Sequence, residues 1–115
     1  MQVGYLEIVT PEVDAVSAAY AAAHGVTFSE PIAALGGAVV ASLAGGGQLG
    51  IRAPLRADEE PVVRPYMLVE DIEEALLEAQ RAGGQVAVPA MPLPGQGTCA
   101  IYLLGGVDHG LWQSE

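Results

Sequence analysis

The sequence predicts an α+β fold in which two tandem βαβββ units form a curved mixed sheet with a concave ligand cup. The first observation is an internal repeat, because the stretch VGYLEIVTPEVDAV from Val3 recurs in residue type and order as VVRPYMLVEDIEEA from Val62. The second is that each stretch is an extended apolar run followed by an acidic helix start. The third is a glycine after each expected helix, at Gly25 and Gly84. An internal repeat defines a fold better than any single residue does.

The first unit, residues 1–53, is predicted to contain a strand, a helix and three further strands. Residues 3–9 alternate in a way that places Leu6 and Ile8 on one side of a strand. Thr10 suits a helix N-cap, Pro11 suits the first helical position, and Gly25 suits the helix end. The further strands are expected at residues 26–30, 38–44 and 48–52, with a glycine turn at 45–47 before the last of them.

The second unit, residues 62–115, repeats this order. A strand is expected at residues 62–69, and a helix from Asp71 to the Gly83-Gly84 pair. Further strands are expected at residues 85–88, 98–104 and 109–113, with Pro89 ending the first of these three. Residues 53–61 carry two prolines and an acidic triplet, so they link the two units of a single domain, 1–115. One helix per unit leaves the other face of the sheet free to form the cup.

Composition excludes several classes of partner. The net charge is −10, with four arginines and no lysine, so there is no basic patch for nucleic acid. No apolar run approaches the length of about 20 residues that spans a membrane, and no secretory leader is recognised. Cys99 is the sole cysteine, which excludes an internal disulfide and favours a cytoplasmic protein. The acidic clusters are interpreted as solvated surfaces and helix starts, or alternatively as an acidic groove for a cationic ligand.

Strand alternation also predicts which side chains face the cup. Aromatic walls with few charges are typical of a small-molecule site. In the alternative interpretation, Arg64 pairs with Glu7 and simply satisfies it, and Trp112 packs in the core or in an interface. The candidate ligand-binding residues are Tyr5, Glu7, Arg52, Arg64, Tyr66, Tyr102 and Trp112.

Two stretches, VEDIEEALLEAQRAGGQV and the ending PGQGTCAIYLLGGVDHGLWQ, resemble the vicinal oxygen chelate superfamily, which includes glyoxalase I, extradiol dioxygenases and bleomycin resistance proteins. The ending resembles a glyoxalase-like branch whose last strand reads G-L-W-Q. The resemblance implies the fold predicted above. Members of the superfamily include isomerases, lyases, dioxygenases, epimerases and drug-sequestering proteins, so the fold does not choose a function.

Enzymes of this superfamily usually hold a divalent metal with His, Glu or Gln from the first and last strand of each unit. The repeat places Tyr5, Gly50, Arg64 and Gly110 at these four positions. None of them is a usual metal ligand, because glycine has no side-chain donor and arginine is permanently charged. We therefore expect no metal and no cofactor. Glu7 and His109 are the nearby groups that could form a displaced metal site.

The leading functional hypothesis is a metal-free glyoxalase-like protein that binds a small planar aromatic compound, such as an antibiotic or natural product. The alternative is a lyase, isomerase or dioxygenase of the superfamily with an atypical site, using a displaced metal or a Glu7/Tyr5 acid–base pair. In the leading hypothesis Gly50 and Gly110 leave an open flat wall, and Arg52 and Arg64 can meet a carboxylate or phenolate on the ligand. Cys99 is expected to point into the core rather than to act as a nucleophile. A homodimer that covers the strand edges is expected.

Overall fold

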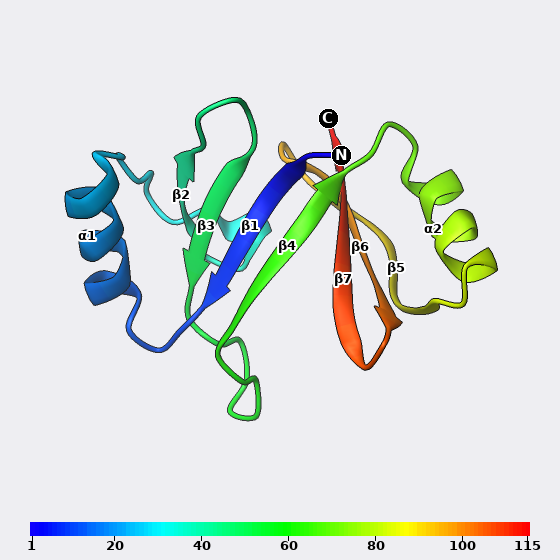
Figure 1. The fold of residues 1–115 in the computed structure, drawn as a ribbon. Coiled ribbons are helices and arrows are strands. Elements are labelled where there is room, and N and C mark those ends of the chain that lie inside the picture. Colours follow the sequence, from blue (N-terminus) through cyan, green and yellow to red (C-terminus); the bar gives the residue numbers. More distant parts are fainter. The chain divides into compact units, whose positions relative to one another are not determined.

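The structure is a computed structural model that describes residues 1–115 (Figure 1). Seven strands form one mixed sheet in the order β2-β3-β1-β4-β7-β6-β5. The α+β class and the mixed sheet are thus confirmed. The elements in chain order are β1 Val3–Val9, α1 Val13–His24, the 3-10 helix η1 Ala33–Leu35, β2 Val39–Ser42, β3 Gln48–Arg52, β4 Val62–Leu68, α2 Ile72–Arg81, β5 Gln85–Leu93, β6 Gly97–Leu104 and β7 Val107–Ser114.

The chain divides into two compact units, which are described separately below. One unit is Leu6–Val63, and the other combines Met1–Tyr5 with Arg64–Glu115. Strand β1 therefore contributes its first residues to one unit and its last residues to the other. Neither helix of the protein is both long and apolar enough to cross a membrane.

In the unit Leu6–Val63, α1 covers a core of Ile8, Leu49 and Ile51, which confirms the predicted inward face of β1. Helix α1 begins at Val13, two residues later than predicted, because the hydroxyl of Thr10 accepts a hydrogen bond from the Glu12 N–H before the helix starts. The helix ends as predicted at Gly25. This glycine adopts the left-handed conformation, with φ 66°, that closes many helices.

The strand predicted at residues 26–30 is wrong, and the sheet has seven strands instead of eight. The segment contacts its neighbour at two points. The Ser29 N–H donates to the Val40 carbonyl at 2.8 Å and the Ser29 hydroxyl accepts from the Val40 N–H at 3.1 Å, while Ile32 forms an isolated bridge with Ala38. Pro31 removes one backbone donor, which prevents a continuous ladder. Strand β2 is shorter than predicted and pairs antiparallel with β3.

In the other unit, α2 lies over a core of Ile72, Leu76, Ala100 and Leu111. Asp71, at which the helix is predicted to begin, is its N-cap and accepts a hydrogen bond from the Glu74 N–H at 3.1 Å. A second acceptor comes from β7, because the side-chain oxygen of Gln113 accepts from the Ile72 N–H at 2.8 Å. The start of α2 is therefore held both by its own cap and by the last strand.

Strand β5 continues to Leu93, so the predicted stop at Pro89 is wrong. β5 is an edge strand whose neighbour is β6. An edge strand tolerates proline because the backbone on its outer side has no ladder partner. Register shifts on both sides of Val88 show that the pairing of β5 is irregular in the region of Pro89.

Two adjacent leucines of α2 provide a matched test of this core. Leu76 is 6% exposed within the core, whereas Leu77 is 46% exposed. We expect Leu76→Ala to lower the free energy of unfolding by about 2–5 kcal/mol, because it removes buried methyl groups and leaves a cavity. Leu77→Ala should change it by less than about 0.5 kcal/mol. Urea titration of both variants measures these changes. Equal losses of unfolding free energy would contradict the conclusion that Leu76, and not Leu77, faces the core.

Candidate functional site

Three of the predicted ligand-binding residues, Tyr5, Tyr66 and Trp112, pack against one another and are called the aromatic cluster. The rings of Tyr5 and Trp112 are stacked, with centroids 4.8 Å apart and planes at 17°. Tyr66 meets both edge-on, at 5.9 Å from Tyr5 and 6.2 Å from Trp112. Stacked and T-shaped pairs are the two arrangements that aromatic quadrupoles favour. All three side chains are buried, so the rings form each other's environment.

The cluster depends on a glycine in β7. Tyr66 lies opposite Gly110 in the parallel pair β4–β7. A Cβ atom at residue 110 would lie 2.5 Å from Cδ2 of Tyr66 and 2.8 Å from the Pro65 carbonyl oxygen, closer than real side chains approach. The open wall predicted at Gly110 is therefore wrong, because the ring of Tyr66 covers the place that the missing side chain leaves.

A second glycine stands beside Trp112. A Cβ atom at Gly4 would lie 3.1 Å from Cδ1 of Trp112 and 3.3 Å from Cβ of Leu68. These distances are tighter than ordinary van der Waals contact, so glycine at this position lets β1 approach the indole closely.

Arg64 is the charged group nearest to the aromatic cluster along β4. It precedes Tyr66 by two residues and therefore shares its face of the strand. Its side chain is 14% exposed, and Nη2 lies 3.5 Å from Oδ2 of Asp108, which is 44% exposed. The predicted pairing of Arg64 with Glu7 stays a prediction.

Tyr102 lies on the other side of the sheet from the position predicted for it. It packs against the core beneath α2 and stacks on His109, with centroids 5.1 Å apart. The strand register explains this, because Cys99 pairs with Trp112, and Tyr102, three residues further, points to the opposite face. Cys99 is buried, as predicted. His109 Nε2 lies 3.0 Å from the Leu104 carbonyl oxygen.

Glu7 and Arg52 belong to the unit Leu6–Val63, where they join Glu59 in what we call the charge cluster. Arg52 Nε donates to Glu7 at 2.9 Å, while Nη1 and Nη2 donate to the two oxygens of Glu59 at 2.9 and 2.8 Å. The Leu55 N–H adds a fourth bond, to Glu59 at 2.7 Å. Glu7 and Arg52 are each 7% exposed.

Sequence reasoning missed Glu59, because its acidic triplet was interpreted as solvated. The hydrogen bonds from Arg52 are the main reason that the pKa of Glu59 is lowered to about 2. The same bonds, together with the charge of Glu7, raise the pKa of Arg52 above its usual value. Four of the five N–H bonds of a guanidinium are enough for these contacts and for the Ala53 carbonyl. A ligand carboxylate can form the paired hydrogen bonds with Nη1 and Nη2 of Arg52 only by replacing Glu59.

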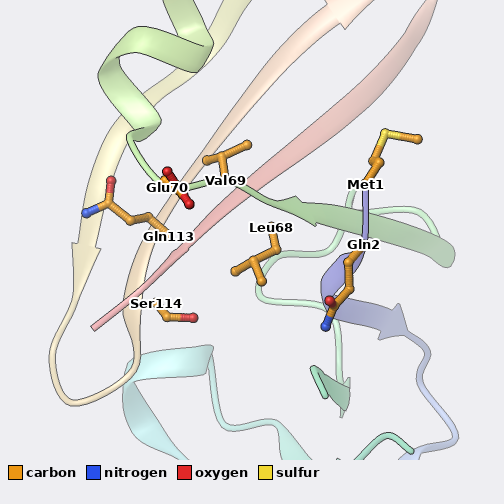
Figure 2. A pocket seen from close by; sticks show the side chains of 7 residues that line it. All are labelled: Met1, Gln2, Leu68, Val69, Glu70, Gln113 and Ser114. Carbon is orange, nitrogen blue, oxygen red and sulfur yellow. The ribbon is translucent and has the colours of Figure 1, made fainter. Parts of the chain in front are cut away.

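A cavity of about 480 Å³ lies at the ends of β1, β4 and β7. Figure 2 shows side chains around it, including Leu68, which pairs with Trp112, and Gln113, which caps α2. None of its residues was among the predicted candidates. They are Met1, Gln2, Leu68, Val69, Glu70, Gln113 and Ser114.

The two groups predicted as alternative metal ligands have other contacts. Glu7 accepts from Arg52, and His109 stacks on Tyr102. No group of three or more His, Cys, Asp or Glu side chains in residues 1–115 could hold a metal ion.

Comparison with solved structures identifies the fold. The hypothetical protein BH1468 from Bacillus halodurans matches with a TM-score of 0.80 and 14% identity, over 99% of this chain and 94% of that one. Methylmalonyl-CoA epimerase from Mycobacterium tuberculosis matches with a TM-score of 0.78 and 15% identity, over 99% and 88% of the two chains. A Streptomyces coelicolor methylmalonyl-CoA epimerase variant in complex with 2-nitronate-propionyl-CoA matches at 0.73 and 16%, over 99% and 97%.

At these identities the likeness establishes the fold alone, which is of the vicinal oxygen chelate type. No family model and no curated protein matches the sequence.

The contact between Tyr66 and Gly110 predicts a strong coupling between these positions. Gly110→Ala should lower the free energy of unfolding by about 1–3 kcal/mol, because the added methyl group collides with the ring. In a Tyr66→Leu background the same change should lower the free energy of unfolding by less, because only the contact with the Pro65 carbonyl would remain. Urea unfolding of the four proteins measures the coupling. Equal costs in both backgrounds would show that the ring does not require glycine at 110.

The lowered pKa of Glu59 predicts a pH-dependent contribution to stability. Because the pKa of Glu59 is about 2 in the folded protein and about 4.5 in the unfolded chain, the contribution is complete above pH 4.5 and is lost as the pH falls toward 2. Glu59→Gln should lower the free energy of unfolding by about 1.5–3 kcal/mol at pH 7. The difference from wild type should shrink between pH 4.5 and 2. Glu60→Gln, at an exposed neighbour, is the control and should show no such difference.

Proposed function

We propose that this protein is a metal-free, glyoxalase-like small-molecule binding protein whose ligand is a planar aromatic compound, such as an antibiotic or another natural product. One observation carries the proposal. The ring of Tyr66 fills the place beside Gly110 where enzymes of this superfamily, by the predicted register, carry a metal-binding side chain.

A second position supports the same proposal. Tyr5 also stands where a metal ligand is expected, and its ring is stacked on Trp112. Two of the four expected ligand positions thus contribute to an apolar aromatic cluster rather than to a set of metal donors. Aromatic ring faces favour another planar ring, which gives the proposed class of ligand.

The proposed membership of the G-L-W-Q branch is supported by the role of each of these four residues. Gly110 admits the ring of Tyr66, and Leu111 belongs to the core beneath α2. Trp112 stacks on Tyr5, and Gln113 accepts a hydrogen bond from the first residue of α2. The motif therefore combines the aromatic cluster with the contact that holds the start of α2.

Ligand binding in this proposal includes a rearrangement of side chains. The three rings are only 3–6% exposed, so a ligand that stacks on one of them must displace another. The ligand then selects or induces an open arrangement of the cluster. The neighbouring cavity of about 480 Å³ is within the range of small-molecule pockets, and it provides the entrance, next to Leu68. Arg64 provides a charge-assisted bond to a carboxylate or phenolate on the ligand.

The test uses the single tryptophan of the chain, Trp112. Planar aromatic compounds that are neutral or anionic should raise the melting temperature and change the Trp112 fluorescence, because they bind the folded protein at the cluster. Arg64→Ala should weaken the best anionic compound by about tenfold or more, which corresponds to about 1.4 kcal/mol. Arg81→Ala is the matched control: it removes an exposed arginine of α2 and should leave the affinity unchanged.

Two outcomes would overturn this proposal. Cationic compounds that bind instead, and more tightly to Arg64→Ala, would favour the acidic-groove interpretation. A stoichiometric metal in protein purified without chelator, lost on Glu7→Ala or His109→Ala, would favour the lyase, isomerase or dioxygenase alternative. Elemental analysis should instead find far less than one metal ion per chain.

The proposal also includes a cytoplasmic homodimer. The exposed strand edges, β2 and β5, are the surfaces that pairing would cover. Light scattering at a fixed protein concentration measures the mass, and a monomer mass in a concentrated sample would exclude the dimer.

A further inference from the structure

The carboxylate of Glu59 is bound as an external carboxylate ligand would be. Three N–H groups converge on it: Nη1 and Nη2 of Arg52, at 2.9 and 2.8 Å, and the backbone N–H of Leu55, at 2.7 Å. The two nitrogens of the guanidinium each donate to a different oxygen, which is the paired geometry that gives arginine its specificity for carboxylates. We call Arg52 and the Leu55 N–H the carboxylate site.

Contacts that do not include Glu59 hold Arg52 in place. Its Nε donates to Glu7 at 2.9 Å, and Nη1 also donates to the Ala53 carbonyl at 3.2 Å. Gly36 lies against its stem, because a Cβ atom at residue 36 would be 3.0 Å from Cδ of Arg52. These contacts orient the guanidinium group of Arg52, so the carboxylate site is organised before any carboxylate enters it.

Glu59 belongs to the linker, residues 53–61. Apart from the contacts of the Glu59 carboxylate, the contacts described for this linker lie at the surface. The ion pair between Arg56 and Asp58 is at the surface, with side chains 71% and 84% exposed. Such pairs contribute little to stability. Leu55 is 65% exposed. The Glu59 carboxylate, whose side chain is 12% exposed, makes the buried link between the linker and β3.

We propose that the carboxylate site binds small carboxylic acids, that Glu59 occupies it as an internal ligand, and that an external carboxylate which replaces Glu59 releases the part of the linker that follows Leu55, residues 56–61. The two occupants exclude each other, since both need the same three N–H groups. Glu59 is seven residues from Arg52 in the chain, so its effective concentration at the site is on the order of millimolar or higher. A simple acid must exceed this concentration in the wild-type protein, whereas it meets no competitor once Glu59 is removed. This proposal does not depend on the aromatic cluster.

Trypsin provides a direct measure of linker release. The chain has four arginines and no lysine, so cleavage after Arg56 reports on the linker, and cleavage after the exposed Arg81 of α2 is an internal reference. Glu59→Ala should raise the ratio of cleavage at Arg56 to cleavage at Arg81 by about tenfold, the change expected when a bond worth about 1.4 kcal/mol is lost. Glu60→Ala, at an exposed neighbour, should leave the ratio unchanged.

Acetate then tests the site itself, with chloride at equal ionic strength as the control. About 100 mM acetate, well above the millimolar effective concentration of the linker carboxylate, should raise the melting temperature of Glu59→Ala more than chloride does. It should raise the melting temperature of Glu60→Ala, relative to the chloride control, by less than that of Glu59→Ala, because acetate must compete with Glu59 in that variant. Equal shifts with acetate and chloride in Glu59→Ala would overturn the carboxylate site, and an unchanged cleavage ratio in that variant would overturn the release of the linker.

The wild-type protein keeps the proposal testable if Glu59→Ala does not fold. Increasing acetate should raise the ratio of cleavage at Arg56 to cleavage at Arg81 in wild type, because acetate displaces Glu59, whereas chloride at equal ionic strength should not. Equal ratios in the two salts would overturn the proposal. The cleavage ratio and the melting temperature are both measured without any aromatic ligand. Failure of the aromatic-cluster proposal would therefore leave these two measurements unchanged.

Discussion

The contact between the ring of Tyr66 and the backbone of Gly110 constrains the unit that contains α2. The parallel pairing of β4 with β7 sets these residues side by side, and a side chain at 110 would occupy the space of the ring. With the ring in place, Tyr66 meets Trp112 edge-on, and Trp112 stacks on Tyr5. One missing Cβ atom thus permits the packing of three aromatic residues.

Much of the fold could be predicted because the repeat and the alternation of apolar residues act locally. Both helices, the end of α1 at Gly25 and the inward face of β1 followed from side-chain spacing and capping chemistry. The predictions were wrong for segments whose secondary structure depends on hydrogen bonding to a neighbouring strand. Residues 26–30 have strand-like composition but no continuous ladder, and β5 passes through Pro89 because it is an edge strand.

The candidate site could be predicted only as a set of residue types on a face. Alternation placed Tyr5 and Trp112 on the same face of the sheet. It could not show that their rings stack on each other, since that depends on contacts between strands far apart in sequence. Tyr102 was misplaced because its side depends on the β6–β7 register. Glu59 was missed because nothing in an acidic triplet distinguishes the one carboxylate that reaches a buried arginine.

The ion pairs of the arginines have a consequence for the electric field around the protein. Each arginine has a carboxylate partner: Glu7 and Glu59 for Arg52, Asp58 for Arg56, Asp108 for Arg64, and Glu74 and Glu78 for Arg81. The positive charges are thereby neutralised locally, and the net charge of −10 governs the potential at longer range. A negatively charged molecule approaching from solution is repelled beyond contact distance, and dissolved salt screens that repulsion over about 10 Å at 0.1 M. For anionic molecules, encounter with this protein is therefore faster at higher ionic strength, the reverse of the behaviour of proteins that attract their ligands by charge.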